Sequence, residues 1–491
     1  MLHWKYSLCI LFILLICSIG LGCESPVISE KHEEVTLDSG NPFAPEPSED
    51  ANEVEDIEPT ERLENPFEEP SVPESKPVEG ESFESIGDFR GMSPKEPQLG
   101  LTYHQSDGNR IVGGKGQFPK IPFAEALLKG EPLWVVGSSL SSTKAAFCVA
   151  LKDGSLQAFV WEAGKLTPKP LSTQQLPAGM PPALVAQDGK IEVLGPPSAK
   201  ASTTTHPVFL PSTKALAFVE KSGDLVLWKG KELARASVKA LPDARILVDE
   251  RERLLLLTHP TDKYGHGVLG DKIEATGITL LETKPKLRVV KVISIPSPRV
   301  VEGISPIWVD LDGDNNREII VTQADASQGA QIVAYHEDGR IFATGPAIGQ
   351  GYRWRHQLAV APFGPKGELE LVDVLTPHLG KQTEFFQLKG GKLQVMTRVG
   401  GYTSHLIGSR NLDSAVAGDF DGDGKMELVL PSSDYTSIGA IQHTPQGAKV
   451  IWQLQAGSRV LSNLSGLSVG GRLLLAAGLE GKRLRVWGTL R

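Results

Sequence analysis

Two nine-residue stretches, 310–318 and 419–427, place acidic side chains at their positions 1, 3, 5 and 9. These residues are Asp310, Asp312, Asp314 and Glu318 in the first stretch, and Asp419, Asp421, Asp423 and Glu427 in the second. Carboxylates at alternate positions of a tight loop converge on one point, where they would repel one another without a cation. Ca²⁺ prefers such oxygen ligands and takes about six to eight of them. The spacing therefore predicts two structural calcium sites.

The remaining positions of both stretches fit a calcium loop. Positions 4 and 6 hold residues that tolerate the left-handed backbone of a sharp turn, namely Gly313, Asn315, Gly422 and Gly424. Position 7, which is Asn316 or Lys425, would offer its backbone carbonyl as a ligand. The acidic residue at position 9 would complete the set of ligands.

Two other interpretations of these loops are open. An EF-hand needs an acidic residue at position 12 and a helix behind it, but position 12 is Val321 or Leu430. The segments that follow, 319–322 and 428–430, are aliphatic or β-branched and favour strands instead. The second alternative is a hairpin turn rich in Asp and Gly that binds no ion.

The segment Gly418–Gly424, followed by Glu427-Leu428-Val429, resembles the FG-GAP/VCBS repeats of integrin-type β-propellers. The stretch that begins at Asp310 matches this pattern with Asn315 in place of a glycine. The resemblance covers these two repeats and is weak over the rest of the chain. It implies one such loop between two strands of a blade, with calcium making the connection rigid.

A degenerate third copy lies between the two loops. The segment Ala361–Val372 keeps the turn and the strand, but Pro362, Gly364 and Lys366 replace the aspartates, so we expect no calcium there. Glu318, Glu370 and Glu427 are 52 and 57 residues apart. A period of about 50 residues is typical of a propeller blade with four strands.

The rest of the chain after residue 132 also favours strands. Hairpin-like glycine turns precede short alternating or apolar runs such as Asp224–Trp228 and Arg483–Trp487, with no strong amphipathic helix between them. We therefore expect an all-β propeller of about seven four-stranded blades, within a range of six to eight. The last strand, Leu484 to Leu490, would close the ring by pairing near residues 132–137.

The N-terminus indicates export. An apolar stretch from Leu8 to about Leu21 is too short to span a membrane comfortably and has the length of a signal-peptide core. Gly22-Cys23 behind it resembles a bacterial lipobox, although Gly20 and Leu21 depart from the usual pattern. We expect Cys23 to be lipidated; ordinary secretion and an uncleaved anchor are the alternatives. Cys148, in an apolar run, is expected to be an inert core residue.

Residues 24–97 contain 22 Asp and Glu, 5 Lys and Arg, and 11 Pro. Such a composition cannot bury enough apolar surface to fold, so it predicts a disordered tether with a net charge of −17. Since the whole chain carries −9 and Lys5 adds one positive charge, residues 98–491 carry +7. A basic body suits anionic polymers such as an acidic polysaccharide. The cationic residues form no long cluster, so nucleic acid is not expected as a partner.

These features predict four regions. They are a lipoprotein-type signal peptide over 1–22, the tether over 23–97, a lead-in segment over 98–131, and the propeller over 132–491 with repeats near 304–345, 357–399 (degenerate) and 413–456. We expect an exported lipoprotein of the bacterial cell envelope, facing the periplasm or the surface. Its lipid anchor would hold a non-catalytic binding or scaffolding module at the membrane, with an anionic polysaccharide or an envelope protein as partner.

The alternative function is a secreted carbohydrate-active enzyme, a lyase or a hydrolase, on the same scaffold. The sequence contains no HExxH, GxSxG or GxxxxGK[ST] motif, and nothing in it requires catalysis. The best candidate for a sugar-binding segment is Arg353-Trp354-Arg355-His356, because tryptophan stacks on sugars and arginine binds carboxylates. The other interpretation is a polar loop between blades with its tryptophan in the core. An enzyme would need Arg, Lys, Tyr or His side chains that converge at one mouth of the channel.

Overall fold

The computed structural model describes residues 97–489. The expected signal peptide, Cys23 and nearly all of the acidic tether lie outside the described residues. Within residues 97–489 every regular element is a β-strand, and none is a helix that could cross a membrane.

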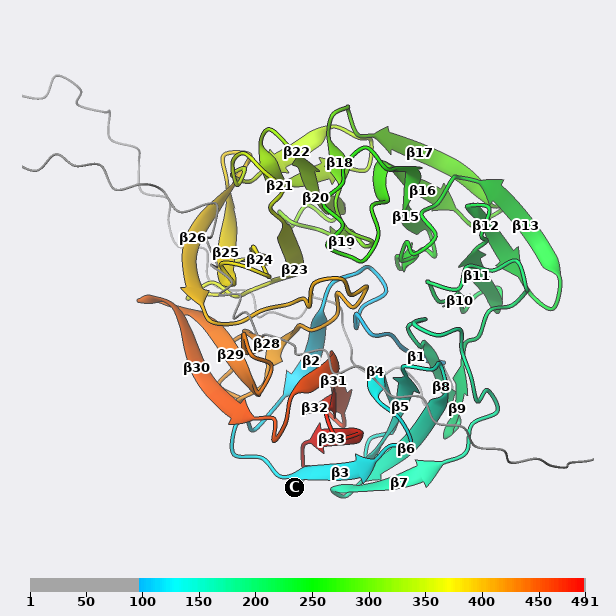
Figure 1. Ribbon diagram of the computed structural model, residues 1–491, viewed down its shortest axis with the longest axis vertical. Helices are drawn as coiled ribbons and strands as arrows, with labels where there is room; N and C mark the ends of the chain where they lie inside the picture. The colour runs from blue at the N-terminus through cyan, green and yellow to red at the C-terminus, as the bar shows by residue number, and fades with distance from the viewer. Residues whose placement is uncertain (1–96, 490–491) are drawn as a thin grey trace, which may run out of the picture. The chain divides into compact units, whose positions relative to one another are not determined.

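The strands of this region form five hydrogen-bonded sheets, and they lie around a common centre, as Figure 1 shows. The two largest, of 13 and 9 strands, consist of three and two smaller sheets joined by short links, which gives eight sheets in all. Seven of these sheets have four strands each. The first four in the chain are β4 (Pro132–Ser141), β5 (Lys144–Leu151), β6 (Leu156–Glu162), β7 (Lys165–Lys169); β10 (Val208–Leu210), β11 (Ala215–Val219), β12 (Asp224–Trp228), β13 (Glu232–Ser237); β14 (Leu247–Val248), β15 (Leu254–Thr261), β16 (Glu274–Glu282), β17 (Arg288–Ser294); and β19 (Ile307–Val309), β20 (Glu318–Asp325), β21 (Gly329–His336), β22 (Ile341–Thr344).

The other three are β23 (Arg355–Ala361), β24 (Glu370–Leu375), β25 (Gln382–Lys389), β26 (Lys392–Gly400); β27 (Val416–Asp419), β28 (Glu427–Pro431), β29 (Ser437–Thr444), β30 (Gly447–Gln455); and β31 (Val460–Val469), β32 (Arg472–Leu479), β33 (Arg483–Trp487), β3 (Phe123–Leu127). The eighth sheet has three strands, β1 (Gln98–Gly100), β8 (Leu184–Gln187) and β9 (Lys190–Val193). Two further strands, β2 (Ile111–Lys115) and β18 (Val300–Val301), bridge neighbouring sheets.

The all-β propeller expected from the sequence is confirmed by this strand pairing. The number of sheets in the described region, eight, equals the upper limit of the expected six to eight blades. It is eight because the short three-stranded sheet adds to the seven four-stranded ones. Each expected repeat coincides with one sheet: β19–β22, β23–β26 and β27–β30.

The ring closes differently from our expectation. Strand β33 pairs with β3, at Phe123–Leu127, and not with residues 132–137. Those residues begin β4, which opens a sheet of its own and hydrogen-bonds β5. The side-chain amide of Asn463 in β31 joins the two sheets, accepting from Val135 N at 2.8 Å and donating to Val135 O at 2.8 Å.

The segment expected to lead into the propeller belongs to it. Residues 98–131 contribute β1, β2 and β3 to three different places in the ring. Between β1 and β2 the chain crosses the centre (Figure 1), where Ser106 hydrogen-bonds Val248 O and Asp107 O accepts from Trp308 N. The propeller therefore begins about thirty residues before the expected boundary at 132, since these strands carry too little periodicity to be recognised in sequence.

A buried ion cluster anchors the crossing segment. Asp413 Oδ2 accepts hydrogen bonds from Thr102 Oγ1 at 2.7 Å and from Arg245 Nη2 at 2.9 Å. Arg110 Nη2 lies 3.5 Å from the other oxygen, Oδ1. Burial alone would raise the pKa of Asp413, but the guanidinium groups of Arg245 and Arg110 outweigh it and hold the pKa below its usual value. The cluster joins three segments that are far apart in the sequence.

Replacing Asp413 should therefore destabilise the whole ring. Asp413→Asn keeps the shape but leaves two buried guanidinium groups without their carboxylate, which should lower the free energy of unfolding by about 3–5 kcal/mol. Equilibrium denaturation with urea measures this. Asp338→Asn, at an exposed ion pair with Arg340, is the control and should leave the stability unchanged. Equal stability of the Asp413 variant and the parent protein would contradict the anchoring role.

Candidate metal centres

The two acidic loops occupy equivalent positions in two blades. Residues 310–317 connect β19 to β20, and residues 420–426 connect β27 to β28. In both loops the residue at position 9, Glu318 or Glu427, begins the second strand of the blade. The loop therefore lies between two strands of one blade, as the resemblance implied.

Backbone conformation and hydrogen bonds shape each loop. Gly313 and Asn315 have φ of 85° and 68°, and the matching Gly422 and Gly424 have 85° and 89°. The left-handed conformation at position 6 turns its N–H toward the aspartate at position 1. Asn315 N donates to Asp310 Oδ2 at 2.8 Å, and Gly424 N donates to the equivalent aspartate oxygen at 3.1 Å. Asparagine thus replaces glycine in the first loop without changing the turn.

All four predicted carboxylates converge in the second loop, and three of the four converge in the first. In the second loop one oxygen from each acidic residue lies within 4.8 Å of all the others, and this set is Asp419, Asp421, Asp423 and Glu427. In the first loop the same holds for Asp310, Asp312 and Asp314. Glu318 lies outside this set.

The two residues at position 7 hydrogen-bond the aspartate at position 5 of their own loop. Asn316 Nδ2 donates to Asp314 Oδ2 at 3.0 Å, and Lys425 N donates to Asp423 Oδ1 at 2.8 Å. These bonds tighten the loops around the aspartates.

Several oxygens of these loops are buried without a hydrogen-bond partner among the described residues. Glu427 is fully buried; its Oε2 accepts from Phe420 N at 2.6 Å, while its Oε1 has no partner. Asp419 Oδ1 is also buried and has no hydrogen-bond partner among the described residues. Glu318 repeats the pattern, with Leu311 N on Oε2 at 2.9 Å, and its Oε1 has only His336 Nδ1 at 3.5 Å. A buried carboxylate oxygen without a partner is costly, so these atoms fit a bound cation.

In the degenerate loop, side chains satisfy the buried glutamate at position 9. Glu370 at its position 9 is fully buried, like Glu427. Its carboxylate accepts from Gln387 Nε2 at 2.7 Å, and His443 Nδ1 lies 2.9 and 3.0 Å from its two oxygens. Side chains from β25 and β29 thus satisfy this carboxylate in the loop that lacks the aspartates. The sequence contained no signal for this role of His443.

The electrostatics of both loops favour a bound cation. Burial, together with the neighbouring charges of Asp421 and Asp419, raises the pKa of Glu427 to about 9. Burial also raises the pKa of Glu318 to about 7, with Asp312 and Asp314 adding to it. Without a cation, Glu427 therefore holds a proton at neutral pH, whereas Glu318 is protonated only in part.

A second group of polar residues surrounds Trp354, in the tetrapeptide 353–356 that the sequence singled out. Trp354 is buried and its ring stacks on that of His356, with centroids 4.8 Å apart. Arg355 Nη1 pairs with Asp373 Oδ2 at 2.9 Å and with Glu384 Oε2 at 2.5 Å. The tryptophan and this arginine therefore serve the core, as the alternative interpretation of the tetrapeptide held.

More histidines gather around the same tryptophan. His378 Nε2 lies 2.7 Å from His405 Nδ1, and His266 Nδ1 lies 2.5 Å from Glu302 Oε1. Burial lowers the pKa of His378 to about 4 and that of His405 to about 3, so both rings are neutral at physiological pH. The loops between blades bring these residues together, and no sequence pattern indicated this because the histidines are scattered along the chain.

No family model and no curated protein matches this chain. Among solved structures it is similar to the β-propeller domain of Cps50 (Swd1) from Myceliophteria thermophila, at 10% identity and a TM-score of 0.40, covering 74% of this chain and 99% of that chain. A chain of the mitotic checkpoint complex has 12% identity, a TM-score of 0.40 and coverages of 76% and 97%. BBS1N, solved in complex with ARL6DN, has 11% identity, a TM-score of 0.42 and coverages of 74% and 94%. Similarity this low carries no argument about function, and the fold rests on the strand pairing.

The raised pKa of Glu427 predicts how stability without calcium depends on pH. The ordinary pKa is 4.5 and the folded value is about 9, so between these values the folded state holds a proton that the unfolded state has lost. In chelator the melting temperature should therefore fall as the pH rises from about 5 to 9. Glu427→Gln, which cannot ionise, should weaken this fall. Calorimetric melting across the pH range measures it, and a melting temperature that rises with pH in chelator would contradict the prediction.

Proposed function

We propose that this protein is an exported lipoprotein of the bacterial cell envelope whose calcium-stabilised propeller is a non-catalytic binding or scaffolding module. The observation that carries the calcium part is the pair of buried, unpartnered oxygens on Glu427 and Asp419, beside two further aspartates. The contrast with Glu370, which a histidine and a glutamine satisfy, supports the same conclusion.

The chemistry of the donors selects the ion. Both loops offer carboxylate oxygens and no sulfur or imidazole nitrogen within the converging set. Hard oxygen ligands in a flexible loop suit Ca²⁺, whereas zinc and copper sites favour nitrogen and sulfur. A bound ion would neutralise the aspartates and replace the proton on the buried glutamate. Its chemistry is therefore structural: it joins two strands of a blade through their loop.

The envelope part of the proposal rests on the sequence alone. The apolar stretch from Leu8 to about Leu21 and the following Cys23 support export and lipid attachment. The acidic residues 24–97 would then separate the propeller from the membrane. Protein partners and anionic polysaccharides are both ligands that a propeller surface could bind in this setting.

The alternative, a carbohydrate-active enzyme, depends on the polar cluster around Trp354. Half-buried His266 and His378 and exposed Tyr352 and Arg353 lie at its outer side. Most of the inner groups are already engaged: Arg355 with carboxylates and His405 with Ser409 O. The binding module is therefore the better supported of the two.

Single substitutions in each loop test the calcium sites. The full chain should bind two ions by calorimetry, and each ion at 100 times its Kd should stabilise the fold by about 2.7 kcal/mol. Asp421→Ala and Asp312→Ala should each remove one ion and about half of the calcium-dependent rise in melting temperature. In chelator neither variant should lose stability, because each removes one of several repelling charges.

The degenerate loop supplies the matched control. Lys366→Ala changes the residue at its position 5 and should leave both the number of ions and the calcium-dependent rise unchanged. Identical melting of the parent chain in calcium and in chelator would rule out structural calcium.

A further inference from the structure

Five large apolar side chains are exposed on loops at one face of the propeller. They are Ile273, Tyr352, Leu379, Leu406 and Ile407, and they are called the apolar loop surface below. Leu379 is 77% exposed and Ile407 is 65% exposed. The other exposed large apolar residues of the described region all lie on the last strand of a sheet, at the outer edge of the ring (Figure 1). Exposed apolar side chains that gather in one place mark contacts with a protein or a membrane.

The topology places these loops on a single face. They connect the second strand of a blade to the third, or one blade to the next, over residues 262–273, 345–354, 376–381 and 401–415. Because neighbouring strands of a blade are antiparallel, both kinds of connection lie on the same face. The acidic loops connect first strands to second strands, so they lie on the opposite face.

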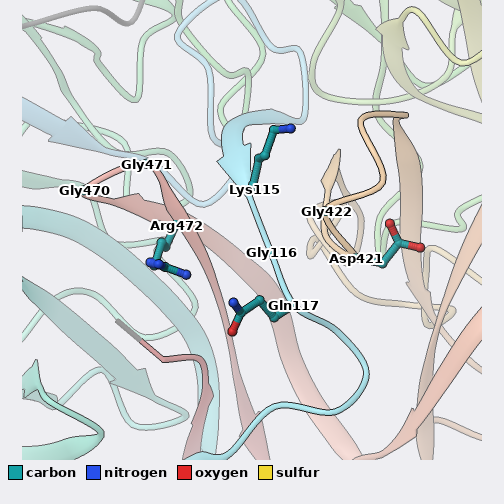
Figure 2. A pocket seen from close by; sticks show the side chains of 8 residues that line it. All are labelled: Lys115, Gly116, Gln117, Asp421, Gly422, Gly470, Gly471 and Arg472. Atoms are coloured by element: carbon teal, nitrogen blue, oxygen red, sulfur yellow. The ribbon is translucent and has the colours of Figure 1, made fainter. Parts of the chain in front are cut away.

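The surface beside the second acidic loop has a different character. A cavity there is lined by four glycines and by Lys115, Gln117, Asp421 and Arg472, with no large apolar side chain. Figure 2 shows the ammonium of Lys115 and the guanidinium of Arg472 pointing apart, with the Asp421 carboxylate in the same lining. The apolar loop surface therefore has no counterpart beside this loop.

Contacts between the four loops hold the apolar loop surface in place. His378 and His405, on neighbouring loops, hydrogen-bond each other with Nε2 and Nδ1 2.7 Å apart. Gly408 N donates to Val268 O at 2.8 Å, which joins a third loop. The ring of His378 stacks on that of Trp354, in the fourth loop, with centroids 6.0 Å apart. The exposed side chains are therefore presented by an ordered scaffold, and binding does not have to pay for ordering these loops.

Positive charge accompanies the apolar side chains. Four cationic residues of the same loops form no ion pair within the described region, namely Lys263, Lys272, Arg353 and Lys381. Of the acidic residues on these loops, Asp413 is buried among arginines and Asp271 pairs with Arg410 at 2.5 Å. Only Asp262 is exposed and unpaired. The loops therefore combine exposed apolar groups with a net positive charge.

This combination fits an anionic lipid bilayer better than a protein partner. Lysine is depleted in protein interfaces relative to the rest of a protein surface, yet three of the four cations are lysines. Surfaces that lie in the headgroup layer of a bilayer instead combine leucine and aromatic side chains with lysine and arginine, which face the anionic headgroups. Tyrosine, here Tyr352, is enriched at the same depth.

We propose that the apolar loop surface docks on an anionic lipid bilayer, with Leu379, Leu406 and Ile407 in the headgroup layer and the four cations against the lipid phosphates. The propeller itself makes this contact. The inference goes beyond the proposed function, because it requires neither calcium nor a lipid on Cys23. A propeller docked in this way would turn its acidic loops away from the bilayer.

Vesicle titration of a labelled full chain tests the contact. Ile407→Cys carries a polarity-sensitive fluorophore in a chain whose Cys9, Cys17 and Cys23 are replaced by serine, while Cys148 is buried. Its emission should shift to the blue with vesicles of phosphatidylglycerol and phosphatidylcholine in equal parts, and brominated acyl chains should quench it. Vesicles of phosphatidylcholine alone should require at least tenfold more lipid, because they offer no net negative charge.

The matched control is Ile341→Cys on β22, which replaces an isoleucine that is 58% exposed at the outer edge of the ring. A fluorophore at this position should not shift with either kind of vesicle. Absence of a shift at position 407 with the anionic vesicles, or an equal shift at position 341, would overturn the proposal.

The label separates this contact from the proposed lipid anchor. It reports the surroundings of position 407, so attachment of a vesicle to the apolar stretch Leu8–Leu21 would not by itself shift its emission. Failure of the anchor proposal would instead appear in mass spectrometry of the parent chain, as absence of a lipid on Cys23.

Substitutions of the cations test the orientation of the docked propeller. Lys272→Gln and Arg353→Gln should each raise the lipid concentration at half of the shift by about fivefold, because each removes one charge near an anionic surface. Lys366→Gln, in the degenerate loop on the opposite face, removes the same charge and should leave that concentration unchanged. An equal effect of this control would show nonspecific attraction and overturn the docking surface.

A second copy of the chain is the competing occupant of the apolar loop surface. Analytical ultracentrifugation of the full chain without vesicles detects it, and the Cys23→Ser chain should sediment as a monomer over the concentrations used for labelling. A dimer that Leu406→Ser together with Ile407→Ser abolishes would assign the surface to self-association and overturn the proposal.

Discussion

The buried carboxylate of Asp413 is the interaction on which the centre of the ring depends. It binds Thr102 and Arg245 directly and lies beside Arg110, so the crossing segment, the entry to β14 and the entry to β27 meet at one point. Removing such charges from water is expensive, and only their mutual pairing compensates for the loss. The cluster therefore fixes a unique arrangement of segments that are separated by up to 311 residues.

This central contact explains how the repeated sheets form a closed ring. Blades in a row contact only their neighbours, and an open row would leave its two ends unsatisfied. Here the residues before β4 supply β3 to the last sheet and β1 to the three-stranded sheet, with β2 inserted between two others. One N-terminal segment thereby ties together sheets that are distant along the chain, and it can do so because Thr102 and Arg110 are held at the centre.

Features that depend on recurring local residues could be predicted from the sequence. Contacts between residues far apart in the chain could not. The position-9 glutamates and the aspartates of 310–318 and 419–427 predicted both loops, their strands and the blade period, because these contacts are local. The pairing of β33 with Phe123–Leu127 was not predictable, since a five-residue edge strand with little apolar alternation resembles any loop. Arg110, Arg245 and His443 carry no local signal either, because their roles depend on partners 73 or more residues away.

Three consecutive blades each contain a glutamate at the same position, namely Glu318, Glu370 and Glu427. Each begins the second strand of its blade and is fully buried, so each needs a partner for its carboxylate. The middle blade uses Gln387 and His443, whereas the outer two place aspartates beside the glutamate, where a proton or a bound cation would offset the repulsion. Side-chain partners thus serve the buried glutamate of the repeat that lacks the aspartates, as a bound cation would in the other two. On the calcium proposal, the two acidic loops are the places where the stability of a blade depends on a bound ion.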